Sequence, residues 1–189
     1  MANLRFVLLL LGVMLCFNSW REFSLYSTGT SEPETVQLEA LGSNEDISNI
    51  HLTVTDFIFA DEYVFEEEED TGKVTRAWIP LLLEGDMQEL KQPKYPVVAR
   101  VSGLKGNEQK LQSVFQRHQL TGVVVSNIAG LKSDEKQLMS TIVPGSDLSK
   151  AVIFDVDRSF PTAGSIAGFF FGGLALVGVF VWWQFFSGR

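Results

Sequence analysis

Acidic side chains form the densest group of chemically capable residues in this sequence. Five of them stand in a row, Glu66, Glu67, Glu68, Glu69 and Asp70. Such a run could bind a cation or dock a basic partner. Calcium loops, however, space their oxygen ligands with turns and glycine, and this run lacks that spacing. We interpret it as a solvated, self-repelling hairpin tip, with a docking patch for a basic partner as the functional alternative.

Two further carboxylates, Asp155 and Asp157, flank Val156 on a predicted strand, where alternate side chains share a face. A carboxylate pair could bind a metal ion or transfer a proton. The more ordinary interpretation is the solvent-facing side of a half-buried strand, and we favour that interpretation.

Other reactive side chains are sparse. His51 and His118 are far apart in the sequence and lack a metal-ligand spacing, and Cys16 is the single cysteine, which excludes a disulfide scaffold. No serine lies in a nucleophile-elbow pattern, and no glycine-rich loop resembles a phosphate-binding loop. The sequence therefore predicts no catalytic residue, no metal site and no cofactor.

Composition limits the function classes further. The chain has 189 residues, of which 46% are hydrophobic and 20% charged, so wholesale disorder is excluded. The formal net charge of −8 argues against nucleic-acid binding, because neutralising phosphates requires an excess of Lys and Arg. Without the terminal Arg5 and Arg189, the remaining 13 basic and 23 acidic residues give the middle of the chain a charge of −10.

The C-terminal segment carries the clearest structural signal. No charged residue occurs between Ser159 and Gly188, and residues 163–186 are apolar except for Ser165 and Gln184. About 20 apolar residues in a helix cross the ~30 Å hydrocarbon core of a bilayer. The sequence therefore predicts a transmembrane helix over residues 163–186.

The N-terminal segment, residues 4–20, is also mostly apolar. Its uninterrupted apolar part, residues 6–17, has a length that suits either a short anchor or the hydrophobic region of a signal peptide. Small residues at the spacing of a cleavage site are missing. We therefore expect an uncleaved transmembrane signal-anchor, with a cleaved signal peptide and a peripheral helix as the alternatives.

Two spans would place both termini on one side of a membrane and the central domain on the other. Translocation that is led by an N-terminal apolar segment favours a domain outside the cytoplasm, and acidic domains translocate readily. A bacterial periplasm and an organellar intermembrane space fit equally well. We thus expect an integral membrane protein with an extracytoplasmic central domain.

Between the two spans, the pattern predicts a linker over residues 21–35 and a soluble α+β domain over residues 36–158. Its fold class is α+β, with a mostly antiparallel sheet and two short helices. Apolar residues alternate over 51–66 and again over 74–83, on either side of the turn sequence 70–73, which predicts a hairpin. Further strands are predicted over 95–101, 120–128 and 151–156, with a short strand or helical turn over 36–41.

Helical spacing appears in two places in this domain. One helix is predicted over 107–118 with Asn107 as its N-cap, and another begins with Ser133 as its cap and ends at Pro144. The expected core residues come mainly from the strands: Phe57, Ile58, Trp78, Val98, Phe115, Val124 and Ile153.

Three glycines in the C-terminal span, Gly164, Gly168 and Gly172, are spaced four residues apart. On a helix they form one smooth ridge, along which another helix can approach closely. Glycine is also common in membrane helices without such a role. We predict helix packing through this ridge, either with the first span or with another chain.

One short stretch resembles a known family. The segment Arg76-Ala77-Trp78-Ile79-Pro80 is similar to the Arg-Gly-Trp-hydrophobic-Pro strand of the Surfeit-locus cytochrome oxidase assembly proteins, with Ala77 in place of the glycine. That family also has two terminal spans around a β-rich domain. The resemblance implies a role in maturing a respiratory oxidase, near haem, and it assigns no site residues. Packing at an edge or at a strand end explains Trp78 and Pro80 equally well.

Three function classes follow from these patterns. The first is a membrane-anchored accessory or assembly protein that binds other membrane-protein subunits, or a second copy of itself through the C-terminal helix. The alternative is a small membrane-bound enzyme or oxidase-maturation factor with an unrecognised site. A channel element is the third, although two spans without an intramembrane charge make a poor conduit. We favour the first class, and we expect no nucleic-acid partner.

Overall fold

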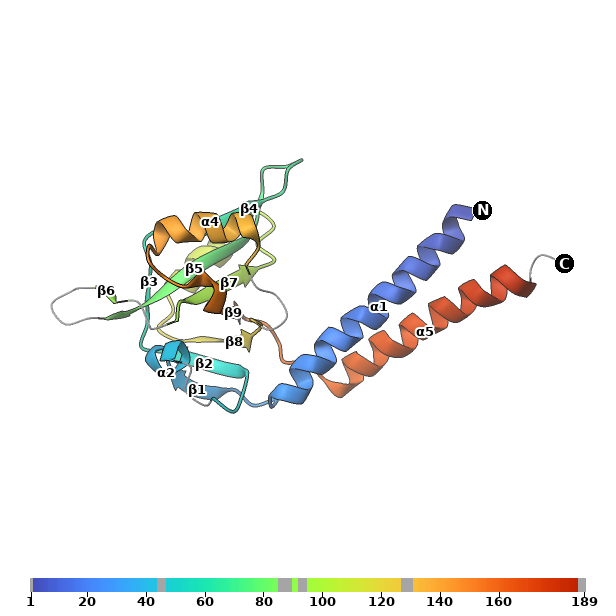
Figure 1. Ribbon diagram of the computed structural model, residues 1–189, viewed down its shortest axis with the longest axis horizontal. Helices are drawn as coiled ribbons and strands as arrows, with labels where there is room; N and C mark the ends of the chain where they lie inside the picture. Colours follow the sequence, from blue (N-terminus) through green and yellow to red (C-terminus); the bar gives the residue numbers. More distant parts are fainter. Residues whose placement is uncertain (1, 44–46, 85–89, 92–94, 127–130, 187–189) are drawn as a thin grey trace. The chain divides into compact units, whose positions relative to one another are not determined.

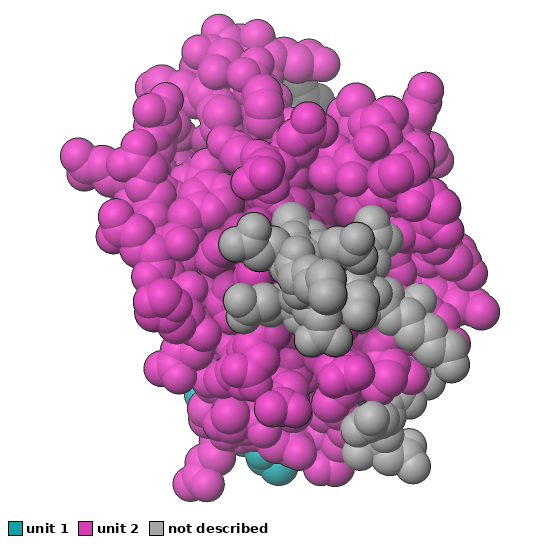
Figure 2. Space-filling model, turned by 90° about the vertical axis from the view of Figure 1, so that its left-hand side faces the viewer, with its two compact units in different colours: residues 1–31, 161–189 teal, residues 32–160 magenta. Residues whose placement is uncertain are grey.

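The computed structural model describes residues 2–43, 47–84, 90–91, 95–126 and 131–186 (Figure 1). The chain divides into two units, coloured teal and magenta in Figure 2. We call residues 1–31 and 161–189 the helix pair, and residues 32–160 the sheet unit. The predicted domain, residues 36–158, thus corresponds closely to the sheet unit.

The helix pair consists of α1 (Ala2–Thr28) and α5 (Ala163–Phe186). Both helices are long and apolar enough to cross a membrane, with mean hydropathies of 1.5 and 2.0 over their apolar stretches. Little of either helix is buried within the protein, unlike the core helix of a soluble domain. These properties are compatible with the two predicted spans.

Residues 21–28 are helical, although the sequence predicted the start of a linker there. No glycine or proline interrupts the helix between Gly12 and Gly29. The hydroxyl groups of Ser27 and Thr28 donate to the carbonyl of Ser24 at 3.0 and 2.9 Å, so polar residues are accommodated in the last turn. The connection to the first strand is therefore much shorter than expected.

The described residues of the sheet unit form a nine-stranded mixed sheet. The strands are β1 (Glu34–Gln37), β2 (His51–Thr55), β3 (Ile58–Phe59), β4 (Val64–Glu67), β5 (Val74–Glu84), β6 (Leu90–Lys91), β7 (Val97–Ser102), β8 (Leu120–Val124) and β9 (Val152–Val156). The helices of this unit are α2 (Leu38–Ser43), α3 (Glu108–Phe115), α4 (Ser133–Ile142) and a 3₁₀ turn over Leu148–Lys150.

The strand order is β1-β2-β8-β9-β7-β5-β3, and β4 and β6 also pair with β5. The predicted α+β class is confirmed. The hairpin predicted between residues 51–66 and 74–83 is confirmed for β3 and β4, which pair with β5, but residues 51–55 form β2, which pairs with β1 and β8 instead. Two pairings, β1–β2 and β7–β9, are parallel, which the expectation of a mostly antiparallel sheet did not include. A parallel pair needs a long crossover, and α3, β8 and α4 lie between β7 and β9 in the chain.

The helices α3 and α4 lie on opposite faces of the sheet. Neighbouring side chains of a strand point to opposite faces, as Phe65 and Glu66 of β4 do. Phe65 contacts the ring of Tyr63, which packs 5.7 Å from that of Phe115 in α3. Glu66 instead forms an ion pair with Lys132, directly before α4. Figure 1 shows α4 beside β4.

The main core lies on the α3 face, where β5, β7 and β9 present fully buried side chains such as Ile79, Ala99 and Phe154. Of the predicted core residues, the buried ones are Trp78, Val98 and Ile153, and the half-buried ones are Phe57, Ile58, Phe115 and Val124. The central strands are buried on both faces, so the core extends further than the alternating pattern predicted.

Pro80 lies within β5, whereas the sequence suggested an edge or a strand end. On the outer side of β5, β4 pairs with residues up to Trp78 and β3 pairs with Leu81 and Leu82, so Pro80 lies in the gap between these two pairings. The carbonyl of Pro80 accepts a hydrogen bond from Ala60 in this gap. A proline is tolerated there because no neighbouring strand needs its missing N–H.

The two predicted caps have different outcomes. Asn107 caps α3, since its side-chain oxygen accepts a hydrogen bond from the Lys110 backbone N–H at 3.1 Å. Ser133 is the first residue of α4 and not its cap, because Lys132 occupies the cap position. The Glu135 carboxylate accepts the Lys132 backbone N–H at 2.7 Å, so an acidic third position replaces the expected serine cap.

Candidate functional site

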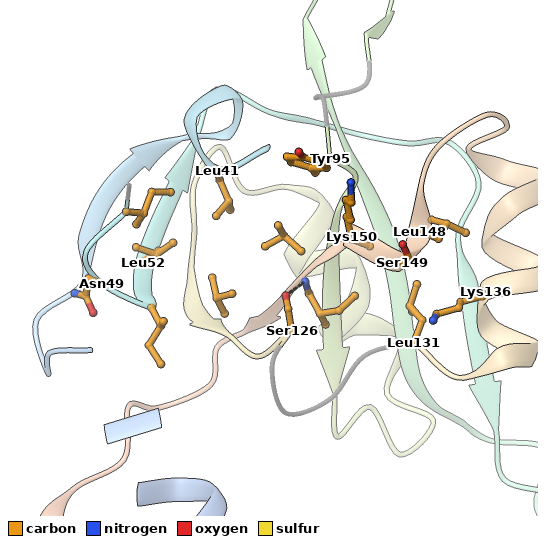
Figure 3. Close-up of a pocket in the computed structure, with 16 residues that line it drawn as sticks. Leu41, Asn49, Leu52, Tyr95, Ser126, Leu131, Lys136, Leu148, Ser149 and Lys150 are labelled. Carbon is orange, nitrogen blue, oxygen red and sulfur yellow. Dashed lines mark hydrogen bonds between the residues drawn. The ribbon is translucent and has the colours of Figure 1, made fainter. Parts of the chain in front are cut away.

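A groove of about 640 Å³ lies at one end of the sheet (Figure 3). It lies where β8 ends and where β2 and β9 begin, and α4 and the 3₁₀ turn border it. Its floor is apolar, with Leu52, Leu131 and Ile153 among its buried residues. Its polar side chains come from separate segments of the chain, namely Asn49, Tyr95, Ser126, Lys136, Ser149 and Lys150. We call this cavity the lysine groove.

The two lysines of the groove have different surroundings. The Lys150 ammonium lies 5.6 Å from the centre of the Tyr95 ring, a cation–π contact, and 3.8 Å from the Asp147 carboxylate (Figure 3). Lys136 extends from α4 beside Leu131 and forms no ion pair with any acidic residue that the structure describes. Neither lysine stands out in the sequence, because the two are 14 residues apart and share no motif.

The rim of the lysine groove is held by hydrogen bonds. The Ser149 hydroxyl donates to Asp147 at 2.5 Å, and the Ser149 backbone N–H donates to the same oxygen at 3.1 Å. Together with the charge of Lys150, these bonds hold the pKa of the Asp147 carboxyl below its usual range. Deeper in the groove, Ser126 accepts the Ile153 backbone N–H at 2.7 Å. The polar groups therefore have defined positions.

A second polar cluster lies at the opposite end of β9, around Asp155. Its carboxylate accepts two hydrogen bonds from Arg100, at 3.2 and 2.7 Å, and Arg158 approaches to 3.5 Å. Asp155 is 6% exposed, so the interpretation of a solvent-facing carboxylate is wrong for this residue. The mixed sheet is the physical reason, because it places Arg100 of β7 directly beside Asp155. The bidentate geometry is that of a structural ion pair.

Asp157 does not share a strand face with Asp155, as the sequence predicted. It follows the end of β9, and its backbone has a φ of +57°, in the left-handed region that aspartate tolerates. Its exposed carboxylate pairs with Arg117 at 2.6 Å. The two aspartates therefore do not form a site together.

Of the five acidic residues, Glu68, Glu69 and Asp70 lie at the end of the β4–β5 hairpin as predicted, whereas Glu66 and Glu67 belong to β4 and pair with β5. Glu66 is paired with Arg76 at 2.9 Å and with Lys132 at 3.5 Å, and Glu68 accepts the Thr71 hydroxyl. Glu67, Glu69 and Asp70 are exposed. The hairpin turn is closed by Gly72, whose φ is +62° and whose N–H donates to the Glu68 carbonyl at 2.8 Å.

Beside this tip, a cavity of about 480 Å³ separates the β4–β5 hairpin from α3. Its aromatic residues are Tyr63, Phe65 and Phe115, and its aliphatic residues include Leu104 and Leu111. Phe65 is 50% exposed beside this cavity, whereas Leu138, the other large apolar side chain that is exposed in the described part of the sheet unit, lies on α4. Glu67 and Glu108 stand at its rim together with Lys73. We call this cavity the aromatic groove. The alternating pattern predicted that Phe65 lies on a strand, but not that its face stays uncovered.

The contact between α1 and α5 uses other glycines than the predicted ridge. A Cβ atom on Gly173 would lie 2.7 Å from the Gly12 carbonyl oxygen and 2.6 Å from the Cys16 Sγ, so the two backbones meet there. A Cβ on Gly168 would meet no atom within 4 Å, whereas one on Gly172 would just reach Leu15, and one on Gly164 only Thr162 of its own helix end. Helix packing through the ridge thus stays a prediction, and the partner helix would belong to another chain.

The histidines are not brought together. His51 stacks on Phe160, with ring centres 5.5 Å apart, and His118 is exposed on the loop after α3. Over the described ranges, no three side chains of His, Cys, Asp or Glu lie close enough to hold a metal ion.

No family model, curated protein or solved structure matches this chain. The resemblance of residues 76–80 to the Surfeit-locus family therefore stays a prediction. In the structure these five residues belong to β5, where they pair with β7, and Trp78 is 4% exposed. Strand packing accounts for them.

Proposed function

We propose that this protein is a membrane-anchored accessory or assembly protein whose sheet unit binds another protein through the aromatic groove. The observation that carries the proposal is the exposed Phe65 beside an acidic hairpin tip. Large apolar side chains that remain exposed next to a cavity are typical of protein-binding surfaces, and aromatic residues often supply their binding energy.

Charge indicates the kind of partner. Glu67 and Glu108 border the groove, and Glu69 and Asp70 extend the negative charge along the tip. A partner segment with an apolar anchor residue and neighbouring Lys or Arg would fill the cavity and meet these carboxylates. Such electrostatic complementarity speeds association and selects the partner.

The helix pair supports the anchoring part of the proposal. Both helices have the length and hydropathy of membrane spans, and their large apolar side chains are exposed. In this proposal α1 is a signal-anchor, and the sheet unit lies outside the cytoplasm. The helix pair would then tether the sheet unit to the membrane in which other membrane subunits reside.

Photocrosslinking in native membranes tests this function. A benzoylphenylalanine at Gln112, which lines the aromatic groove, should capture one defined partner, identified by mass spectrometry. The same residue at Leu138, which is exposed on α4 at the other face, is the matched control. The single variants Phe65→Ala and Glu67→Lys should each reduce the yield of the crosslinked product from position 112. Equal capture from both positions, or capture insensitive to both variants, would refute the proposed surface.

A further inference from the structure

The lysine groove is separate from the aromatic groove, and its chemistry is different. None of the described residues that line it is acidic, although the middle of the chain carries a charge of −10. Two lysines line it instead, one from α4 and one from the segment before β9. A cavity whose described lining contains two lysines and no acidic residue, within an acidic domain, has the electrostatics of an anion site.

The floor of the groove indicates what else the ligand needs. Beside the buried Leu52 and Ile153, the groove is lined by apolar side chains that remain partly exposed, among them Ile50, Val124 and Val152. An apolar body placed against these side chains would remove their remaining apolar surface, and its own, from water. The volume of about 640 Å³ lies in the range of cavities that hold small organic ligands.

The polar groups around this floor are positioned to donate hydrogen bonds. The Ser126 oxygen accepts the Ile153 N–H, which leaves the hydroxyl proton of Ser126 available to a ligand. Lys150 is held over the groove by the Tyr95 ring and by a loose contact of 3.8 Å to the exposed Asp147, which an incoming anion can replace. Lys136 has no described acidic partner to displace.

From these observations we infer that the lysine groove binds a small amphiphilic anion. Its carboxylate or phosphate group lies in the positive field of the Lys136 and Lys150 ammonium groups, and its apolar body lies against the partly exposed side chains of Ile50, Val124 and Val152. This site does not depend on the partner-binding role of the aromatic groove.

Calorimetric titration of the full chain in nanodiscs of neutral phosphatidylcholine tests the inference. The probes are phenyl phosphate, benzoate and benzyl alcohol, which share an aromatic body and differ in charge. We expect saturable binding of at least one of the two anions, and weaker binding of the alcohol. The double variant Lys136→Gln with Lys150→Gln should weaken anion binding about tenfold or more, because it removes both positive charges from the groove. Lys73→Gln, at the aromatic groove, is the matched control and should leave the affinity unchanged.

Two further experiments use the wild-type chain, so their results do not depend on whether the variants fold. The anion that binds should protect Lys136 and Lys150 of the wild-type chain from acetylation, read by mass spectrometry, but not Lys105. Nanodiscs that contain phosphatidylglycerol distinguish the source of the ligand: competition with the soluble probe indicates a lipid headgroup, and unchanged binding indicates a soluble metabolite. Absence of saturable anion binding, or equal affinity of the wild type and the double variant, would overturn the inference.

Discussion

The helix pair and the sheet unit are held together in different ways. In the sheet unit, apolar side chains from both faces of the central strands are removed from water, as Phe154 is completely. In the helix pair, the backbones approach each other at Gly12 and Gly173, and the Ser19 hydroxyl donates to the Ile166 carbonyl at 2.9 Å. The first mode depends on the hydrophobic effect, and the second depends on close packing and hydrogen bonding, which still operate in lipid.

Phenylalanine shows the difference most directly. Phe154 is fully buried, whereas Phe171 and Phe185 of α5 are 66% and 72% exposed. An exposed row of such residues is unfavourable in water and favourable in hydrocarbon. Burial within the protein therefore indicates which side chains stabilise the sheet unit, but it does not do so for the helix pair. The exposed phenylalanines of α5 support the proposed membrane location.

The first prediction tests this comparison where the effect is largest. Phe154→Ala should lower the free energy of unfolding by about 3–5 kcal/mol, because it leaves a cavity among buried strands. Phe171→Ala is the control on the exposed face of α5 and should change the stability of the sheet unit little. Urea unfolding of the full chain in nanodiscs, followed by near-ultraviolet circular dichroism, measures both. Similar losses for the two variants would contradict the distinction.

A second pair of variants compares buried and exposed ion pairs within the sheet unit. Asp155→Asn leaves Arg100 and Arg158 without their shared carboxylate and should cost about 3–5 kcal/mol, because a charge then stays buried and uncompensated. Asp157→Asn breaks the exposed pair with Arg117 and should cost less than about 1 kcal/mol. The same unfolding experiment checks both values, and a cost for Asp155→Asn near that of Asp157→Asn would show that water reaches the site.

The predictions from sequence succeeded where the signal is local. The hairpin turn around Gly72, the Asn107 cap and the two long apolar helices each depend on neighbouring residues, and the structure contains all of them. The strand-or-helix ambiguity over residues 36–41 resolves into both, since β1 runs directly into α2.

The features that the sequence did not predict depend on distant residues. Asp155 looks like a solvent-facing strand residue until the parallel β7–β9 pairing brings Arg100 beside it. Lys136 and Lys150 share a groove only because α4 and the start of β9 meet at one end of the sheet. The spacing of Gly164, Gly168 and Gly172 suggested a ridge, but spacing alone does not decide which face of a helix meets its neighbour.

The third prediction concerns the helix pair itself. Gly173→Val should push α5 away from α1, because its side chain would collide with the backbone of Gly12; overpacking of this kind costs about 1–3 kcal/mol. Gly168→Val is the control, since its side chain would extend into open space. The readout is an oxidative crosslink between the native Cys16 and a cysteine introduced at Phe170, whose carbonyl lies 4.0 Å from the Cys16 Sγ.

The Cys16 crosslink should be lost in Gly173→Val and kept in Gly168→Val. Retention of the crosslink in Gly173→Val would mean that the two backbones do not need to approach closely. If Gly168→Val removed crosslinks between two chains but kept the crosslink within one chain, the predicted ridge would be a surface that binds another chain.

The smallest effects are expected from substitutions of the helix N-caps, which differ between the sheet unit and the helix pair. Asn107 caps α3, and Thr162 caps α5 with a reciprocal pair: its hydroxyl accepts the Ser165 N–H, and the Ser165 hydroxyl accepts the Thr162 N–H, both at 3.2 Å. Asn107→Ala should cost about 1 kcal/mol, the usual loss for an N-cap. The helix α3 has only eight residues, and helices this short are marginal without caps and packing.

Thr162→Ala should cost less than Asn107→Ala, since α5 has 24 residues and its long apolar stretch keeps the backbone hydrogen-bonded in lipid whether or not the first turn frays. Amide hydrogen exchange of the full chain in nanodiscs measures both effects. Exchange should accelerate throughout α3 in Asn107→Ala, but only around Ser165 in Thr162→Ala. If exchange instead accelerated along the whole of α5, the helix would depend on its cap as a short soluble helix does, and the apolar surroundings proposed for it would be wrong.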